Sequence, residues 1–154
     1  MTTGDWRSLR SLRLEALADA PTAFETTLDQ ALAFSDDAWR KRARGLATDQ
    51  LFMAFADNQP IGMAGAVADT DGRWEIISMW VHPAHRGTGV ARELVKAATD
   101  HAACAGATRI LRWVTVGNEV ARSLYERMGF RATGRRQALP GKSPLEEQEM
   151  EQEL

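Results

Sequence analysis

The sequence predicts an α/β fold with one mixed sheet, on two observations. Segments typical of strand, helix, strand and helix follow one another between Arg73 and Gly129, which predicts a right-handed parallel βαβ unit. Two apolar runs before this unit are joined by the turn sequence DNQP, which predicts an antiparallel hairpin. The chain has 154 residues, of which 44% are hydrophobic, so we expect one domain spanning residues 1–154 with its own core.

Two helices are predicted ahead of the hairpin. The first begins at the N-cap residue Asp5 and ends before Pro21, and its apolar residues recur at helical spacing. These residues are Trp6, Leu9, Leu12 and Ala16. The second begins at the N-cap residue Ser35 and carries acidic residues in its first turn and basic residues later, which suits the helix dipole.

The hairpin strands have the sequences LFMAFA and IGMAGAVA, and a third strand has the sequence RWEIISMWV. Because side chains alternate along a strand, the third strand is predicted to have two distinct faces. One face carries Glu75, Ile77, Met79 and Val81, and the other carries Trp74, Ile76, Ser78 and Trp80. A long helix that ends at Gly106 and the strand RILRWVTV complete the parallel unit.

A short helix follows, with Asn118 as its N-cap and Gly129 after its last turn, and then the strand FRATGRRQAL. The C-terminal segment LEEQEMEQEL leaves two alternatives open. Its glutamates favour a helix, whereas the alternation of Gln148, Met150 and Gln152 suits a strand at the edge of the sheet.

Composition argues against several classes of function. A net charge of −2 argues against non-specific binding of nucleic acid. The single cysteine, Cys104, permits no internal disulfide and fits a reducing compartment. No apolar stretch is long enough to span a bilayer and the N-terminus lacks a signal pattern, so we expect a cytoplasmic protein without membrane contact. The three histidines lack the spacing of a metal site, so no metal is expected.

The segment VHPAHRGTGVARELV, residues 81–95, joins the third strand to the long helix through a glycine turn. Such a turn exposes backbone N–H groups at a helix start, where an anion is stabilised. A dinucleotide-binding loop is disfavoured because Arg92 stands in the place of the third glycine, and a Walker loop is disfavoured because no Gly-Lys-Ser/Thr follows.

Two motifs resemble those of the GNAT N-acetyltransferase family. The pattern from Val81 through Pro83, Arg86, Gly87 and Gly89 to Ala91 is similar to its motif A, and NEVARSLYERMGF is similar to its motif B. The resemblance implies a GNAT-like fold and acetyl-CoA as co-substrate. It also implies the cofactor-binding residues, which are Met79, Trp80, Val81, Arg86, Gly87, Thr88, Gly89, Val90, Ala91, Asn118 and Tyr125.

The resemblance further implies how these residues act. The two parallel strands are expected to splay apart, so that the pantetheine arm pairs with backbone groups near Met79 and Val81 and an N–H there stabilises the developing oxyanion. The amides from Gly87 to Ala91 are expected to meet the pyrophosphate, with Arg86 adding a positive charge. Tyr125 is the expected acid that protonates the departing thiolate.

The base and the acceptor site are less defined. Glu75 is the first candidate for the base, Glu25 is the second, and a relay through water is the alternative to both. Candidates for lining the acceptor site are Phe24, Glu25, Trp39 and Trp80. The expected acceptor is a primary amine of a small molecule or peptide; a protein N-terminal or lysine acetyltransferase and a non-catalytic CoA-binding module are the rival interpretations.

The oligomeric state is open between monomer and homodimer. Members of the family usually begin with an edge strand before the first helix, whereas only MTTG precedes Asp5 in this sequence. Either that strand is missing or the chain starts late, and the sheet edge and any dimer contact stay open.

Overall fold

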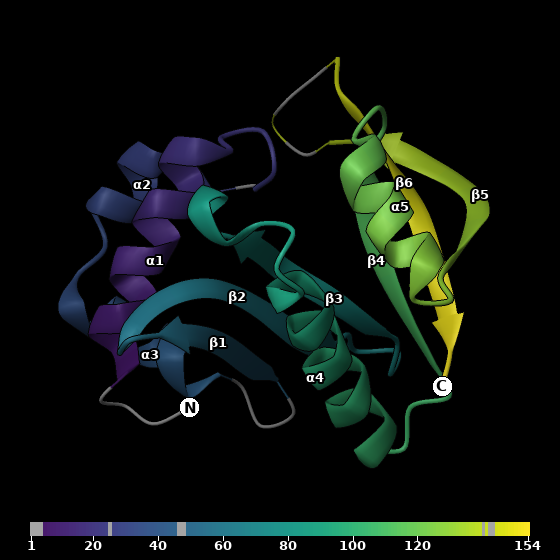
Figure 1. The fold of residues 1–154 in the computed structure, drawn as a ribbon, viewed down its shortest axis with the longest axis horizontal. Coiled ribbons are helices and arrows are strands. Elements are labelled where there is room, and N and C mark those ends of the chain that lie inside the picture. Colours follow the sequence, from purple (N-terminus) through teal and green to yellow (C-terminus); the bar gives the residue numbers. More distant parts are fainter. Residues whose placement is uncertain (1–4, 25, 46–48, 140, 142–143) are drawn as a thin grey trace.

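A computed structural model describes residues 5–24, 26–45, 49–139, 141 and 144–154. The described residues form one mixed sheet with the strand order β1-β2-β3-β4-β6-β5, which confirms the predicted fold class (Figure 1). Among the described strands, only β3 and β4 pair in parallel. The strands are β1 (Gln50–Ala56), β2 (Gln59–Ala68), β3 (Trp74–Val81), β4 (Arg109–Thr115), β5 (Arg131–Ala138) and β6 (Glu146–Glu153).

Helices cover both faces of the sheet. They are α1 (Trp6–Asp19), α2 (Leu28–Leu32), α3 (Asp36–Arg44), α4 (Val90–Cys104) and α5 (Glu119–Arg127). Met63 of β2 packs with α1 and α3, whereas the next residue, Ala64, packs with Leu94 of α4, so these helices lie on opposite faces of the first three strands. Within the described residues, no helix combines the length and the apolar character needed to cross a membrane.

Local capping signals lie where the sequence predicts them. Ser35 Oγ accepts a hydrogen bond from the N–H of Ala38, and Asn118 Oδ1 accepts one from Ala121, as expected of N-caps. Gly106 follows α4 with a φ of 90°, a left-handed conformation that favours glycine. Asp5 stands at the N-cap position of α1, although its side chain makes no capping hydrogen bond there.

The short helix α2 was not predicted. It begins at Thr27, whose hydroxyl accepts a hydrogen bond from the N–H of Gln30 while the Gln30 side chain accepts one from the N–H of Thr27. This reciprocal capping box was present in the sequence as the spacing of these two residues. A helix of only five residues offers too little apolar periodicity to be recognised otherwise.

The C-terminal segment is a strand, but the prediction that it would lie at a sheet edge is wrong. β6 pairs with β4 on one side and β5 on the other, so β5 forms the edge. The burial of Glu147 and Glu149 within β6 is offset by polar partners: Gln137 Nε2 donates to Glu147 and Thr133 Oγ1 donates to Glu149. A helix-favouring composition is therefore overridden by pairing on both sides.

A bulge interrupts β3 at Ser78, whose φ is 55°. Between the pairs Gly65–Ile77 and Met63–Trp80, β3 contains one more residue than β2. The side chains of Met79 and Val81 therefore face α4, as do those of Trp74 and Ile76, while Trp80 faces α1. The prediction of unbroken alternation along this strand is wrong because the extra residue reverses the faces beyond it.

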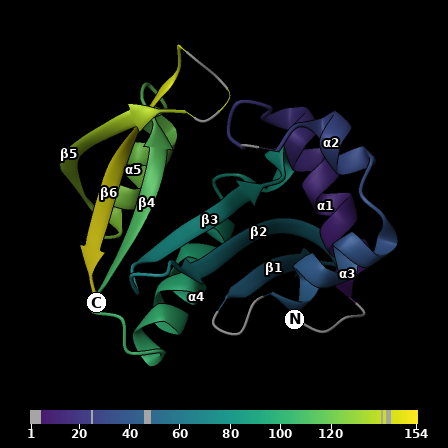
Figure 2. The same cartoon turned by 180° about the vertical axis from the view of Figure 1, so that it is seen from behind.

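The parallel strands β3 and β4 separate along their length. They pair only at Trp74 with Ile110 and at Glu75 with Leu111, near the start of both strands. Figures 1 and 2 show the two strands meeting at one end and diverging toward the other, with α5, β5 and β6 on the side of β4. The expected splay is thus present, and beyond Glu75 this edge of β3 has no partner strand in the part of the chain that the structure describes.

Candidate functional site

The turn between β3 and α4 exposes backbone N–H groups to solvent at the start of the helix. Gly87 and Gly89 have φ values of 75° and 92°. Gly89 occupies the N-cap position of α4, and it has no side chain that could bond the first N–H groups of the helix. The N–H groups from Gly87 to Ala91 have no acceptor among the described residues around them, while Arg86 N–H and Glu93 N–H bond within the turn and the helix. An anion with several oxygens fits such a helix N-terminus.

Thr88 contributes its backbone, not its hydroxyl, to the outward face of this turn. Its Oγ1 donates a hydrogen bond to the carbonyl of His85, which closes the turn internally. Val90 and Ala91 are half-buried and pack with Val81 and Leu94 beneath the turn. The apolar contacts therefore fix the start of α4 against β3.

Arg86 is held by the protein itself. Its Nε donates to the Val81 carbonyl at 3.0 Å, and its Nη2 donates to Asp19 Oδ2 at the end of α1. The indole N–H of Trp80 donates to the same oxygen at 2.9 Å. The cluster of Asp19, Trp80 and Arg86 ties α1 to the glycine turn, so Arg86 positions the turn, and its direct contact with a phosphate stays a prediction.

Asp19 should make the stability of the protein depend on pH in the acid range. The hydrogen bonds from Trp80 and then Arg86 lower the pKa of Asp19 below its ordinary value. A lowered folded-state pKa stabilises the fold fully above the unfolded-chain pKa of about 4, and this contribution is lost as the pH falls through the folded-state pKa.

We therefore expect Asp19→Asn to be less stable than the wild type at neutral pH, with a difference that shrinks as the pH falls below about 4. Urea unfolding of both proteins across this range measures the difference. Asp100→Asn, which removes an exposed carboxylate that bonds only Lys96 within α4, serves as the control and should show a smaller dependence. A constant difference for Asp19→Asn would contradict the assignment.

Arg112 of β4 spans the beginning of the splay. Its Nη1 donates to the carbonyl of Ile76 on β3 at 3.0 Å, just past the last paired residues. Its Nε is buried and has no acceptor among the described residues. Arg112 therefore bridges the two strands where their backbones no longer reach one another.

Tyr125 of α5 lies beside this bridge. Its side chain is buried against Phe130, with ring centroids 5.2 Å apart, and its hydroxyl has no hydrogen-bond partner within the described chain. Burial raises the pKa of Tyr125 above its ordinary value, and the positive charge of Arg112 partly opposes the shift. The phenol is thus protonated at neutral pH, as an acid must be. The role of Tyr125 as the acid stays a prediction.

Glu75 lies at the opposite end of β3 from the glycine turn. It pairs with Val67 of β2 and Leu111 of β4 and is half-buried. Because it precedes the bulge, it shares the face of Ile77, which is the face toward α1. The structure therefore places Glu75 near the α1 side of β3, and its role as a base stays a prediction.

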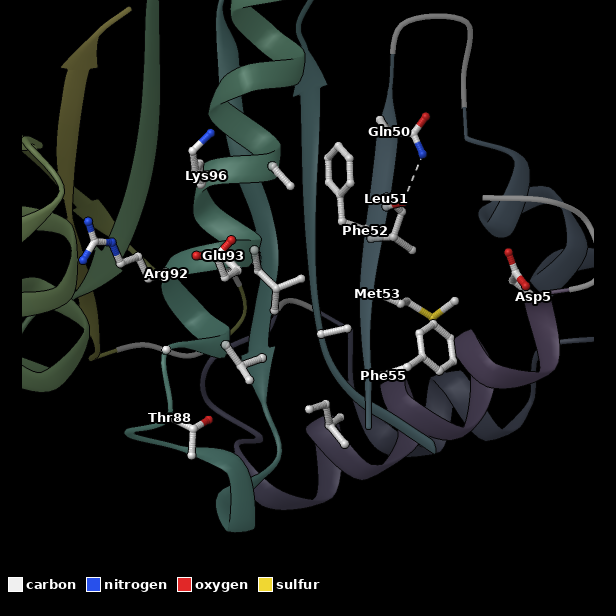
Figure 3. Close-up of a pocket in the computed structure, with 16 residues that line it drawn as sticks. Asp5, Gln50, Leu51, Phe52, Met53, Phe55, Thr88, Arg92, Glu93 and Lys96 are labelled. Carbon is white, nitrogen blue, oxygen red and sulfur yellow. Dashed lines mark hydrogen bonds between the residues drawn. The ribbon is translucent and has the colours of Figure 1, made fainter. Parts of the chain in front are cut away.

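A large groove lies apart from the splay. It has a volume of about 1070 Å³ and runs between β1 and α4 (Figure 3). Thr88, Gly89 and Val90 lie at one end of it, but its lining includes no residue of β3, β4 or α5. The groove therefore lacks the unpaired strand edge and the tyrosine, so we place the candidate site at the splay.

A smaller cavity of about 230 Å³ lies on the other face of the sheet, between α1, α3 and β1–β3. Of the residues predicted to line an acceptor site, Trp39 lines this cavity, whereas Phe24 and Trp80 are buried in the same core cluster and are not in its lining. Glu25 lies outside the described residues. Ile77 and Ser78 form part of its wall, so this cavity and the splay lie on two sides of the β3 bulge.

Several residues at the site were missed from sequence. Arg112 could have been noticed as a charged residue within the mostly apolar β4, and Arg13 because it stands four residues after Leu9, on the side of α1 that carries the buried residues. Ser78 stands in an apolar strand, but nothing in the sequence marks it as a bulge. Asp19 lies 67 residues from Arg86, and no local signal pairs them. No group of three or more His, Cys, Asp or Glu within the described ranges is placed to hold a metal ion.

Comparisons with known proteins agree with this geometry. Residues 9–130 match the sequence model of the acetyltransferase (GNAT) family. No curated protein matches the chain. Among solved structures, nourseothricin acetyltransferase is 29% identical with a TM-score of 0.64, over 70% of this chain and 66% of that one.

Two further structures match over the whole of this chain. Ribosomal-protein-alanine N-acetyltransferase from Brucella melitensis has a TM-score of 0.79 at 20% identity, covering 97% of that chain. An N-acetyltransferase from Thermoplasma acidophilum, in complex with coenzyme A, has a TM-score of 0.75 at 15% identity, covering 96% of that chain. At these identities the likeness concerns the fold.

Proposed function

Because the chain belongs to the acetyltransferase (GNAT) family, we propose that it transfers the acetyl group of acetyl-CoA directly to a primary amine of a small molecule or peptide. The observation that carries this proposal is the unpaired edge of β3, which ends at a turn with outward N–H groups. An extended chain that ends in a diphosphate matches both features at once.

The residues of the turn fit the diphosphate of coenzyme A. Its negative charge would be met by the N–H groups from Gly87 to Ala91 and by the positive end of the α4 dipole. The amide-containing pantetheine arm would add to β3 as a strand does, along the edge beyond Glu75. Arg86, through Asp19, would keep the turn in place for this contact.

Acetyl-CoA would supply the acetyl group as a thioester, whose carbon–sulfur bond breaks as the new carbon–nitrogen bond forms. Tyr125 would hold the proton that the departing sulfur takes, because its buried hydroxyl is protonated at neutral pH and lies beside the splay. Arg112 would stabilise the phenolate that remains until a proton returns from solvent. The bridging contact of Arg112 to Ile76 keeps this charge close to the strand edge.

The acceptor amine must lose a proton before or during its attack. Glu75 would take this proton, directly or through water, from the α1 side of β3. Direct transfer needs no covalent intermediate on the protein, so holding the two reactants in line is the main contribution of the fold.

The proposal is tested by measuring binding and transfer separately. We expect acetyl-CoA to raise the melting temperature of the protein, and we expect thiol release from acetyl-CoA in the presence of a panel of amines, with the acetylated product identified by mass spectrometry. Binding of acetyl-CoA without transfer to any amine would favour a non-catalytic CoA-binding module. Absence of binding would contradict the assignment of the site.

A further inference from the structure

The cavity between α1, α3 and β1–β3 contains a positive charge that no described carboxylate neutralises. Arg13 enters it from α1, and Arg42 lies at its margin on α3. Neither arginine forms an ion pair within the described chain, although Asp49 also lines the cavity. A half-buried guanidinium is costly unless an anion compensates its charge, and among the described residues no ion-pair partner does so.

The contacts of Arg13 hold its side chain in one orientation. Its Nη1 donates to Ser78 Oγ at 2.9 Å, and its guanidinium carbon lies 4.4 Å from the centroid of the Phe24 ring. Both partners are neutral, so they orient the charge without cancelling it. Burial, followed by repulsion from Arg42, lowers the pKa of Arg13 to about 10, and the group therefore stays positively charged at neutral pH.

Most other residues of the cavity wall are apolar, and polar side chains are contributed by Thr26, Asp49 and Gln50. Its walls include Leu9, Phe34, Met63 and Ile77. Trp39 is also part of the wall, and its buried indole N–H has no acceptor among the residues that the structure describes. A small molecule with an apolar body and one anionic group matches this combination of apolar walls and unmatched donors.

The cavity adjoins the bulged part of the strand whose open edge lines the splay. Ser78, which bonds Arg13, is the bulge residue of β3, and the open edge of the same strand forms one side of the splay. A ligand whose anion contacts Arg13 is therefore separated from the proposed thioester position only by the bulged strand. A positive φ at a serine is a strained conformation, and such conformations concentrate at functional sites.

We propose that this cavity is the acceptor pocket and that Arg13 binds a carboxylate of the acceptor, so that the enzyme acetylates small amino acids with apolar side chains. This inference rests on the proposed acetyl transfer. Arg13 would position the substrate by an ion pair with its carboxylate, and the amino group on the adjacent carbon would be directed toward β3. A guanidinium can bond both oxygens of a carboxylate, which also fixes its orientation.

The test compares apolar α-amino acids with the amines that remain when their carboxylate is removed. In the wild type, the amino acids should have a KM about 10- to 100-fold lower than the matched amines. Arg13→Met should abolish most of this difference by raising the KM of the amino acids, while the KM for acetyl-CoA is unchanged. Arg10→Met removes an exposed charge from the same helix and is the matched control, which should behave as the wild type.

The variant Ser78→Ala distinguishes binding of the substrate by Arg13 from a purely structural role in which Arg13 supports the bulge. This variant removes the hydrogen bond to the bulge but retains the guanidinium, so the preference for amino acids should persist. If Ser78→Ala loses the preference as Arg13→Met does, or if the wild type acetylates matched amines equally well, the inference is wrong.

Binding is also measured without turnover, by calorimetric titration of the amino acids into the wild type and Arg13→Met. If no amine is acetylated but amino acids bind in an Arg13-dependent manner, the proposed transfer fails and the anion site stands. If amines are acetylated but no amino acid binds, the anion site fails and the transfer stands.

Discussion

Replacing Tyr125 by phenylalanine is expected to lower kcat by about 100-fold or more and to leave the free energy of unfolding unchanged or raised. The two effects have one cause, since the hydroxyl is buried without a hydrogen-bond partner within the described chain. Removing a buried, unpaired polar group does not destabilise a fold, whereas removing the acid deprives the departing sulfur of its proton. Activity and stability should therefore change independently.

Steady-state kinetics and urea unfolding of the same preparations test this expectation. The binding of acetyl-CoA, measured by thermal shift, should be retained in Tyr125→Phe, because the glycine turn is untouched. Phe130→Leu is the control for packing: it removes the ring that contacts Tyr125 but keeps the hydroxyl, so it should lower stability more than kcat. A kcat close to that of the wild type in Tyr125→Phe would remove Tyr125 from the proposed mechanism.

The parts of this fold that could be predicted are those with local causes. The helix starts at Ser35 and Asn118 depend on side chains that bond the backbone three residues later, and these are visible as spacings in the sequence. The left-handed glycines of the turn are required by the backbone at their own positions. Such interactions form within one short segment, so they do not depend on where that segment lies in the molecule.

The parts that could not be predicted depend on residues far apart in the chain. β6 becomes an interior strand because β4 and β5 both pair with it, and neither partner can be inferred from its own glutamates. The bulge at Ser78 reverses the faces of β3 only because β2 sets a register with one residue fewer. The contact of Arg86 with Asp19 likewise joins the end of α1 to a turn 67 residues later.

The same distinction applies to the site. The glycine turn that we propose to bind the diphosphate could be predicted because all of its N–H groups belong to one short segment. The cavity that contains Arg13 is assembled from α1, α3 and three strands, so its residues are brought together only by the fold. This difference explains why a cofactor class can be inferred from sequence here while the acceptor requires the structure.

Gly89→Val is expected to weaken the binding of acetyl-CoA by at least about tenfold, equivalent to about 1.4 kcal/mol. Gly89 has a φ of 92°, and a β-branched residue disfavours this conformation. The added side chain would meet no described atom within 4 Å of its Cβ, so the backbone conformation, not a clash, is the cause of the effect. If the turn adopted a conformation that valine favours, the N–H groups at the start of α4 would no longer point toward one diphosphate.

The other end of α4 offers a matched control. Gly106 has a φ of 90° and also has no described atom within 4 Å of an added Cβ. Gly106→Val should therefore lower the free energy of unfolding about as much as Gly89→Val does, roughly 1–3 kcal/mol, while acetyl-CoA binds it as it binds the wild type. Equal loss of binding in both variants would mean that general destabilisation, not the geometry of the turn, controls the affinity. If only Gly89→Val loses affinity for acetyl-CoA, the cofactor must be held by the amides that this glycine orients.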